Sequence, residues 1–386
     1  MPSVRKLVAL ALSPTLLLLT SCGRHSTSEV YYLVAANLSL SYWKTAISGF
    51  NAAAARYQVT VKVAGPDNYD PQAELQELKS AIAAKPAGIL ISVADEALLK
   101  PGIDAAVDAG VPVLTIDSDA ATSRRLFFIG TNNRAAGVLG GQRVAEKLGG
   151  RGNVVFFSMP GQPNLDERLQ GFKDVFARYP EIKTLDVVDI KGDARNAFDN
   201  TQQYLTQTGV ARVAAFVCLE ASSGKVVADA VRRQKVTDRV VVAWDVEQDT
   251  LAEISDGTIE ATISQKPYTM AFVGLKELDE IFHNKPKSLS KDYSVDAFSE
   301  YPVFIDTGTS LVDKANVDVY AKSAAEHRKE ETAVGQGKAR VSKARPGLSF
   351  LTPTSLNSRS IPCSPHQQRP VKTCRWGHRA FRMTSF

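Results

Sequence analysis

The sequence predicts an α/β protein with two doubly wound parallel-sheet lobes. Short apolar runs of strand length alternate along the chain with stretches whose apolar residues recur at helical spacing. The apolar runs are rich in valine, isoleucine, leucine and phenylalanine without polar alternation, as expected for strands that helices cover on both faces. The pattern continues for about 290 residues between Val30 and Tyr320, which is more than one hydrophobic core usually spans.

The expected strands are apolar runs between turn-forming residues. In the first half of the chain they are Tyr31–Ala36, Val59–Val63, Gly88–Val93, Val111–Ile116 and Leu126–Ile129. In the second half they are Val154–Phe157, Leu185–Ile190, Val213–Leu219, Val240–Trp244 and Ala261–Ser264. Helical spacing predicts helices that include Trp43–Tyr57, Gln72–Ala84, Arg134–Leu148, Leu165–Arg178 and Gly224–Arg233. Because strands and helices alternate, we expect crossover connections and parallel pairing.

The charge of the chain is unevenly distributed. The whole sequence has a net charge of +5, to which residues 1–21 contribute +2 and residues 332–386 contribute +10 without any acidic residue. Residues 22–331 therefore carry a net charge of −7. Nucleic-acid binding needs a basic surface that neutralises phosphates, so this acidic body argues against a nucleic acid as partner.

The first residues have the order of a secretory leader. Arg5 and Lys6 precede an apolar run, Leu7 to Leu19, that is too short to span a membrane. The run ends in Leu19-Thr20-Ser21-Cys22, which resembles the lipobox of bacterial lipoprotein precursors. The resemblance implies a signal peptide over residues 1–21, a lipidated Cys22, a tether over residues 22–29, and a periplasmic or cell-surface body anchored to a membrane. An ordinary cleaved secretory signal is the alternative.

Cysteine gives no sign of a disulfide framework in the body. Besides Cys22, only Cys218 lies between the leader and the basic tail. Cys218 belongs to an apolar run, where a cysteine usually acts as a small core side chain. We interpret it as structural.

Polar and aromatic side chains follow several of the expected strands. In open α/β sheets, ligands bind outside the carboxyl ends of the strands. These positions hold Asn37, Tyr42, Trp43, Asp117, Asp119, Glu220 and Asp245. Each also has a structural interpretation, since an aspartate after a strand often caps a helix and the aromatic residues could pack in the core. The gathering of carboxylates and aromatic rings at one end of both sheets favours a binding site.

Six groups of residues stand in the order and with a spacing similar to those of one known family. They are Tyr42-Trp43-Lys44 with Gly49-Phe50, Gly110–Asp119, Ile129–Asn133 with Gly137, Glu167–Phe172, Val242–Asp245, and Asp256–Ile259 leading to Gln265. On these motifs, the body resembles the ribose-type periplasmic binding proteins, the sugar-binding class of ABC-transport receptors. The resemblance implies the type I fold of that family: two lobes that are joined by three crossovers and close on one small polar ligand. The first lobe would be residues 30–131 with 266–291, and the second would be residues 132–265 with 292–320.

The resemblance also implies binding residues. Tyr42 and Trp43 match the aromatic pair that covers the apolar face of a sugar. Matches to other binding or contact positions are Asp117, Arg168, Asp245 and Gln265, together with Asn37 and Asp193. These residue types suit the ligand, because carboxylates and a guanidinium bind hydroxyls and aromatic rings pack on C–H groups.

Two positions depart from the ribose binders. Ser118 and then Asp119 stand where an arginine is common, and Leu219-Glu220 stands where Asn-Asp is frequent. Because two donors to a ribose-like ring are missing, we expect another pentose, a hexose or a polyol, with Asp119 and Glu220 still at the site. A phosphorylated sugar is disfavoured, since the carboxylates would repel phosphate and only Arg168 offers a strong positive partner.

The sequence contains little that matches known enzyme motifs. Ser222–Lys225 is followed by Val226 and so lacks the phosphate-loop pattern, and Gly137, Gly140 and Gly141 lack the dinucleotide-binding order. All five histidines of the chain lie outside the matched strand ends. We therefore expect a non-catalytic monomer with no cofactor and no metal.

The resemblance implies a membrane partner. An ABC transporter permease would receive the monosaccharide or polyol from this receptor. A receptor that signals to a membrane sensor, including autoinducer-type furanose sensing, is the alternative that the sequence leaves open. A LacI-type repressor would share the fold, but the N-terminus holds a leader in place of a helix-turn-helix.

Residues 332–386 are basic and rich in proline, serine, threonine and glycine, which predicts a disordered tail. Cys363, His366, Cys374 and His378 could in principle bind zinc, but their spacing matches no common motif. Attraction to an anionic surface is a second possibility. We favour an extension without function.

Overall fold

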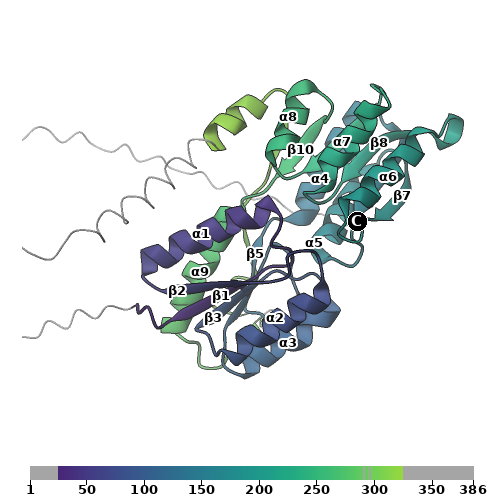
Figure 1. The fold of residues 1–386 in the computed structure, drawn as a ribbon. Coiled ribbons are helices and arrows are strands. Elements are labelled where there is room, and N and C mark those ends of the chain that lie inside the picture. Colours follow the sequence, from purple (N-terminus) through teal and green to yellow (C-terminus); the bar gives the residue numbers. More distant parts are fainter. Residues whose placement is uncertain (1–24, 290–291, 294, 297, 325–386) are drawn as a thin grey trace, which may run out of the picture. The chain divides into compact units, whose positions relative to one another are not determined.

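The computed structural model (Figure 1) describes residues 25–289, 292–293, 295–296 and 298–324. The predicted signal peptide, Cys22, the start of the tether and the basic tail over residues 332–386 lie outside the described residues. The described part belongs to one compact unit that ends at Arg328. No helix in this part of the chain is both long and apolar enough to cross a membrane.

The first lobe is built on a six-stranded, wholly parallel sheet. In the spatial order β11-β5-β4-β3-β1-β2, its strands are β11 (Phe304–Asp306), β5 (Phe128–Gly130), β4 (Val113–Ile116), β3 (Gly88–Ile91), β1 (Val30–Val34) and β2 (Thr60–Ala64). Helices α1 (Ser41–Tyr57) and α9 (Pro267–His283) cover one face, and α2 (Pro71–Ala83) and α3 (Glu96–Asp108) cover the other (Figure 1). Each face has its own core, with Phe50 and Leu275 in one and Leu78 and Ile103 in the other.

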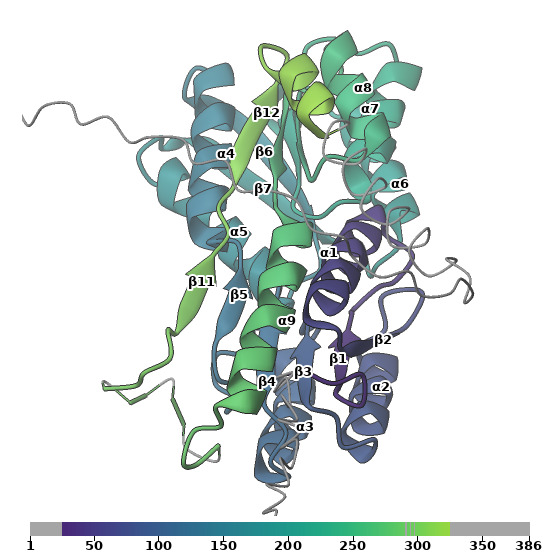
Figure 2. The same ribbon diagram turned by 90° about the vertical axis from the view of Figure 1, so that its left-hand side faces the viewer.

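The second lobe repeats this architecture. In the order β12-β10-β9-β8-β6-β7, its strands are β12 (Ser310–Asp313), β10 (Ala261–Ser264), β9 (Val240–Trp244), β8 (Val213–Cys218), β6 (Arg151–Ser158) and β7 (Glu181–Asp189). Only β12 runs antiparallel to its neighbour. Helices α4 (Asn133–Lys147) and α5 (Pro163–Phe176) cover one face; α6 (Ala194–Leu205), α7 (Ser223–Arg233) and α8 (Gln248–Asp256) cover the other, and a short 3₁₀ helix spans Gly209–Ala211 (Figure 2).

Capping side chains explain where several helices begin. Asp70 accepts hydrogen bonds from the Gln72 and Ala73 amides at the start of α2. Asp95 and Asn132 cap α3 and α4 in the same way. Such caps satisfy amide groups that have no partner inside the helix.

The chain passes between the lobes three times, so the predicted fold is confirmed. The crossovers follow β5, follow β10, and connect β11 to β12. Hydrogen bonds join them: the Thr307 amide donates to the Gly130 carbonyl at 2.9 Å, and the Thr309 hydroxyl donates to the Ser264 carbonyl at 2.7 Å. Two of the crossovers follow the carboxyl ends of β5 and β10, so the carboxyl ends of the parallel strands in both lobes face the region beside the crossovers.

One predicted lobe boundary was wrong. We assigned residues 292–320 to the second lobe, but β11 pairs with β5 in the first sheet. The rings of Phe304 and Phe128 stack at 5.1 Å, and Tyr293 is buried in the first lobe's core. The last crossover therefore comes after Asp306, and only β12 and the segment that follows belong to the second lobe.

Candidate ligand-binding site between the lobes

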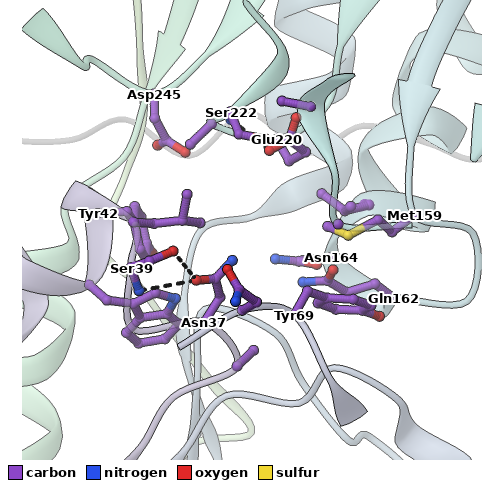
Figure 3. A pocket seen from close by; sticks show the side chains of 18 of the residues that line it. Asn37, Ser39, Tyr42, Tyr69, Met159, Gln162, Asn164, Glu220, Ser222 and Asp245 are labelled. Carbon is purple, nitrogen blue, oxygen red and sulfur yellow. Dashed lines mark hydrogen bonds between the residues drawn. The ribbon is translucent and has the colours of Figure 1, made fainter. Parts of the chain in front are cut away.

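A cavity of about 520 Å³ lies between the two lobes at the carboxyl ends of their strands (Figure 3). Asn37, Tyr42 and Tyr69 line it from the first lobe, and Asn164 and Glu220 line it from the second. Its volume is in the range of small-molecule sites. Since both lobes supply polar groups, a ligand in this cavity would touch both.

Asp117 and Asp245 occupy equivalent positions in the two lobes. Each follows the fourth strand of its lobe, β4 or β9, and each has the left-handed backbone conformation, with φ 64°. At Asp117 the Ser118 amide donates to the Ile116 carbonyl at 2.7 Å, which closes a tight γ-turn. Strained turns of this kind are found where a site must hold a side chain in place. Both carboxylates line the cavity.

Arg168 projects from α5 and is 2% exposed. Its Nε donates to Asn133 Oδ1 at 2.9 Å, its Nη1 to the Leu219 carbonyl at 2.8 Å, and its Nη2 to Gln265 Oε1 at 3.0 Å. The guanidinium also stacks 4.4 Å from the centre of the Trp244 ring. These contacts hold the charge in a fixed position at the cavity wall.

Gln265 connects the cavity to the crossovers. Its Oε1 accepts from the Thr131 hydroxyl at 2.9 Å as well as from Arg168, and its Nε2 donates to Asp245 Oδ1 at 3.0 Å. Thr131 and Gln265 lie in the first two crossovers. A chain of hydrogen bonds thus connects the carboxylate of Asp245 to the first two crossovers.

Burial controls the electrostatics of the cavity. It raises the pKa of Asp245 to about 7 against the attraction of Arg168 and the hydrogen bond from Gln265. Burial also raises the pKa of Asp117, although Arg168, at 4.0 Å, favours the charged form. The Tyr42 hydroxyl donates to Asp117 Oδ1 at 2.8 Å, and burial followed by the charge of Asp117 raises the Tyr42 pKa. The Tyr42 hydroxyl therefore stays protonated and remains a hydrogen-bond donor.

Two acceptors of the cavity have no partner within the described residues. They are Gln162 Oε1 and Asn164 Oδ1, both buried. The Asn164 amide group donates to Asp117 Oδ2 at 3.3 Å, so it bridges the lobes. A buried acceptor costs free energy unless it accepts a hydrogen bond, and a hydroxyl of a ligand would supply one.

Comparison with known proteins identifies the family. Residues 31–286 match the family model described as periplasmic binding protein domain. The chain belongs to this family. It is 22% identical over 303 residues to the ribose import binding protein of Bacillus subtilis, an alignment that covers 73% of this chain and 95% of that protein. It is 25% identical over 287 residues to the D-apiose import binding protein of Paraburkholderia graminis, covering 72% and 89%.

Solved structures agree with this assignment. A sugar-binding protein of a sugar ABC transporter from Bacillus halodurans is 34% identical, with a TM-score of 0.66 and coverage of 76% of this chain and 100% of that chain. An arabinose-binding protein from Geobacillus stearothermophilus is 32% identical, with a TM-score of 0.62 and coverage of 75% and 98%. The named relatives are binding proteins.

Most of the predicted site residues of this periplasmic binding protein line the cavity. They are Asn37, Tyr42, Trp43, Asp117, Arg168, Asp193, Glu220, Asp245 and Gln265. Tyr42 and Trp43 pack edge to face at 5.3 Å and belong to the first lobe's core as well. Their binding roles stay predictions, and so do those of the other seven.

Asp119 lies elsewhere, which corrects the prediction. It is not part of the lining; its carboxylate accepts from Arg125 Nε at 2.6 Å, from Arg125 Nη2 at 2.5 Å and from the Thr115 hydroxyl at 2.5 Å. The guanidinium fork of Arg125 thus holds Asp119 in a loop of the first lobe. Asp119 therefore does not stand in the cavity in place of the arginine that is common in ribose binders.

Glu220 and Asp193 line the cavity, but both also accept hydrogen bonds from backbone amides at the start of a helix. Glu220 accepts from the Ser222 and Ser223 amides, at 2.6 and 2.8 Å, where α7 begins. Asp193 accepts from the Arg195 amide at 2.9 Å and caps α6. The capping interpretation therefore applies to these two carboxylates, whereas Asp117 and Asp245 accept hydrogen bonds from other side chains of the cavity lining.

The sequence interpretation missed Gln162, Asn164 and Tyr69. Gln162 and Asn164 follow β6, and Tyr69 follows β2, so all three obey the rule of strand carboxyl ends that pointed to the other residues. They lie no farther beyond their strands than Tyr42 lies beyond β1, so the same rule could have found them. Cys218 is buried in the second lobe's core, in line with the structural interpretation.

Proposed function

We propose that this protein is an extracytoplasmic receptor that binds a monosaccharide or polyol between its lobes and delivers it to an ABC sugar transporter. The observation that carries the proposal is the cavity in which Asp117, Asp245, Arg168 and Asn164 converge beside Tyr42. Sugar hydroxyls both donate and accept, so they can pair with carboxylates, a guanidinium and amides at once. The ring faces of a sugar suit the aromatic pair Tyr42 and Trp43.

The names of the relatives support uptake over sensing. The Bacillus subtilis and Paraburkholderia graminis proteins are import binding proteins, and the Bacillus halodurans protein belongs to a sugar ABC transporter. Signalling to a membrane sensor, including furanose sensing, is therefore not favoured. Loss of the cognate permease should abolish uptake of the ligand, and undiminished uptake would count against the transport role.

The chemistry of the cavity favours a neutral solute. Asp117, Glu220 and Asp245 would repel a phosphate, and Arg168 already donates to three protein groups. The other two cations of the lining, Lys191 and Arg195, are exposed to solvent, and Arg195 pairs with Asp193. A pentose other than ribose, a hexose or a polyol fits best, since the donors that ribose binders commonly carry are absent from this sequence.

Membrane attachment is part of the proposal. The lipobox at Cys22 would place the receptor on the outer side of a membrane as a lipid-anchored monomer. Cys22→Ser should release the protein into the soluble fraction and remove the lipid mass from its N-terminal peptide. A protein that is cleaved before Ser21 or fractionates as soluble with Cys22 intact would favour the ordinary signal instead.

A thermal-shift screen tests the receptor function. Pentoses, hexoses, polyols, amino acids and nucleosides would be added singly to the protein lacking its leader. One sugar or polyol should raise the melting temperature saturably, because a ligand that binds only the folded state stabilises it. Asp245→Asn should reduce the shift at the same concentration. A shift with an amino acid or nucleoside, and none with any sugar or polyol, would overturn the proposed ligand class.

A further inference from the structure

Four potential metal ligands meet at the start of the described chain, outside the cavity lining. His25 and Glu29 flank a turn in which the Glu29 amide donates to the Ser26 carbonyl at 2.9 Å. Asp279 and His283 stand four residues apart on α9 and so share one face of this helix. One nitrogen or oxygen atom from each of the four lies within 4.8 Å of the others.

The separations suit a tetrahedral ion. His25 Nδ1 is 3.1 Å from Asp279 Oδ2, and His283 Nε2 is 3.1 Å from Glu29 Oε2 and 3.6 Å from Asp279 Oδ1. Zinc binds histidine and carboxylate ligands at about 2.1 Å, and a tetrahedron of that radius places its ligand atoms about 3.4 Å apart. The four groups therefore need little movement to surround one ion.

The cluster is sheltered and has a supporting partner. The side chains of Asp279 and Glu29 are 4% and 12% exposed, so two carboxylates are held close together largely away from water. Such an arrangement is costly unless cations pair with it. The Tyr31 hydroxyl donates to Asp279 Oδ1 at 3.1 Å, as outer partners of metal ligands do.

We propose that His25, Glu29, Asp279 and His283 form a structural zinc site. Two imidazoles with two carboxylates favour zinc over calcium and magnesium, which prefer all-oxygen ligands. Four protein ligands complete a tetrahedron, as in closed structural sites. The ion fastens the N-terminal segment to the end of α9. The sequence did not indicate this site, because 254 residues separate Glu29 from His283 and no short motif joins them.

Zinc titration of the full chain tests the proposal. Cys22, Cys363 and Cys374 are replaced by serine, and His366 and His378 by alanine, so that the tail and the leader offer no competing ligands. Competition with a chelating dye should give one zinc ion per chain. His25→Gln and His283→Gln should each weaken binding by more than Tyr31→Phe, for which the loss of an outer partner predicts roughly a 10-fold effect. His327→Gln, at a histidine that is not one of the four proposed ligands, is the matched control.

The outcomes separate cleanly. Stoichiometric binding that falls in the His25 and His283 variants and persists in the His327 variant supports the site. Absence of zinc binding, or equal affinity in all folded variants, overturns it. Circular dichroism checks folding, and His25 is the most exposed of the four side chains, at 30%, so His25→Gln should disturb packing least. The sugar-induced thermal shift should persist in every variant, so this test is independent of the proposed function.

Discussion

Asp245 is held in an environment that disfavours its charged form. Burial raises its pKa to about 7, even though Arg168 and Gln265 stabilise the carboxylate. A ligand hydroxyl that donates to this group would supply the stabilisation that water gives an exposed aspartate. Ligand binding should therefore favour the ionised carboxylate and lower its pKa.

The first prediction concerns the pH dependence of stability. The pKa of Asp245 is about 7 in the folded protein against an ordinary value of 3.8. Because this pKa is raised, the folded state retains a proton that the unfolded chain has released, and stability falls as the pH rises from about 4 to 7. The contribution is roughly 4 kcal/mol at most. Thermal unfolding of Asp245→Asn between pH 4 and 8 should give a flatter profile, and an unchanged slope would contradict this account.

The second prediction concerns Arg168. Its guanidinium donates to Asn133, Leu219 and Gln265, and lysine cannot reach all three acceptors. Arg168→Lys should lower the free energy of unfolding by about 2–4 kcal/mol and also weaken ligand binding. Chemical denaturation and calorimetry measure the two effects.

Arg195→Lys provides the control for Arg168. Arg195 lies at the cavity rim with its side chain 87% exposed, and it pairs with Asp193. Exposed pairs of this kind contribute little to stability, so the change should stay within about 0.5 kcal/mol. If the two variants lost the same stability, the network around Arg168 would not have the importance we assign to it.

The sequence could indicate most residues of the cavity because the rule of strand carboxyl ends is local. Asp117 and Asp245 come directly after apolar runs, so their place at the sheet edge follows from the pattern. Asp119 also follows an apolar run closely, yet its carboxylate forms an ion pair with the nearby Arg125 and not with groups of the cavity. Side-chain pairing inside a loop depends on the loop's conformation, which apolar periodicity does not report.

Among the elements, α4 and α5 pack closely enough to require glycine at their contact. A Cβ at Gly137 of α4 would lie 2.1 Å from the Arg168 carbonyl oxygen, and one at Gly171 of α5 would lie 2.2 Å from the Arg134 carbonyl oxygen. Both obstacles are backbone atoms, so no side-chain rotation relieves the clash. The position of α5, and with it Arg168, depends on these two glycines.

The third prediction follows from this contact. Gly137→Ala should destabilise the protein by about 3 kcal/mol or more, because α5 must move away from α4. The displacement carries Arg168 with it, so ligand affinity should fall too. Ala135→Ser, on the exposed side of α4, is the matched control and should change neither property appreciably. Denaturation midpoints and calorimetric titration of both variants measure the effects; normal affinity in a destabilised Gly137→Ala would show that Arg168 keeps its place.

The assignment of elements to lobes shows where sequence reasoning stops. The alternation of apolar runs predicted β1 to β10, but the three residues of β11 carry no signal that selects a sheet. Their pairing with β5 depends on the contact between Phe304 and Phe128, which are 176 residues apart in sequence. Short late strands are placed by tertiary contacts, and their lobe cannot be predicted from local pattern.

For the molecule as a whole, the fourth prediction concerns the basic tail. All lining residues of the cavity lie between Ala36 and Gln265, and the compact unit ends at Arg328. Removing residues 330–386 should therefore leave ligand affinity unchanged within about 2-fold, less than 0.5 kcal/mol. Calorimetric titration of the full and shortened proteins provides the comparison. A large loss of affinity would mean that the tail takes part in binding.

The repeated strand order bears on how the specificity of such a protein can change. The strands of each sheet have the same spatial order, and each fourth strand is followed by an aspartate with φ 64°. The two lobes thus form the two sides of the cavity with the same arrangement of strands, yet each lobe's strands that lead to the cavity come from a separate stretch of sequence. A substitution near Asp117 acts first on what one side of a solute meets, and it reaches the groups around Asp245 only through Arg168 and Gln265. Substitutions can therefore change the ligand specificity of one side of the cavity first, while the other side continues to bind the solute.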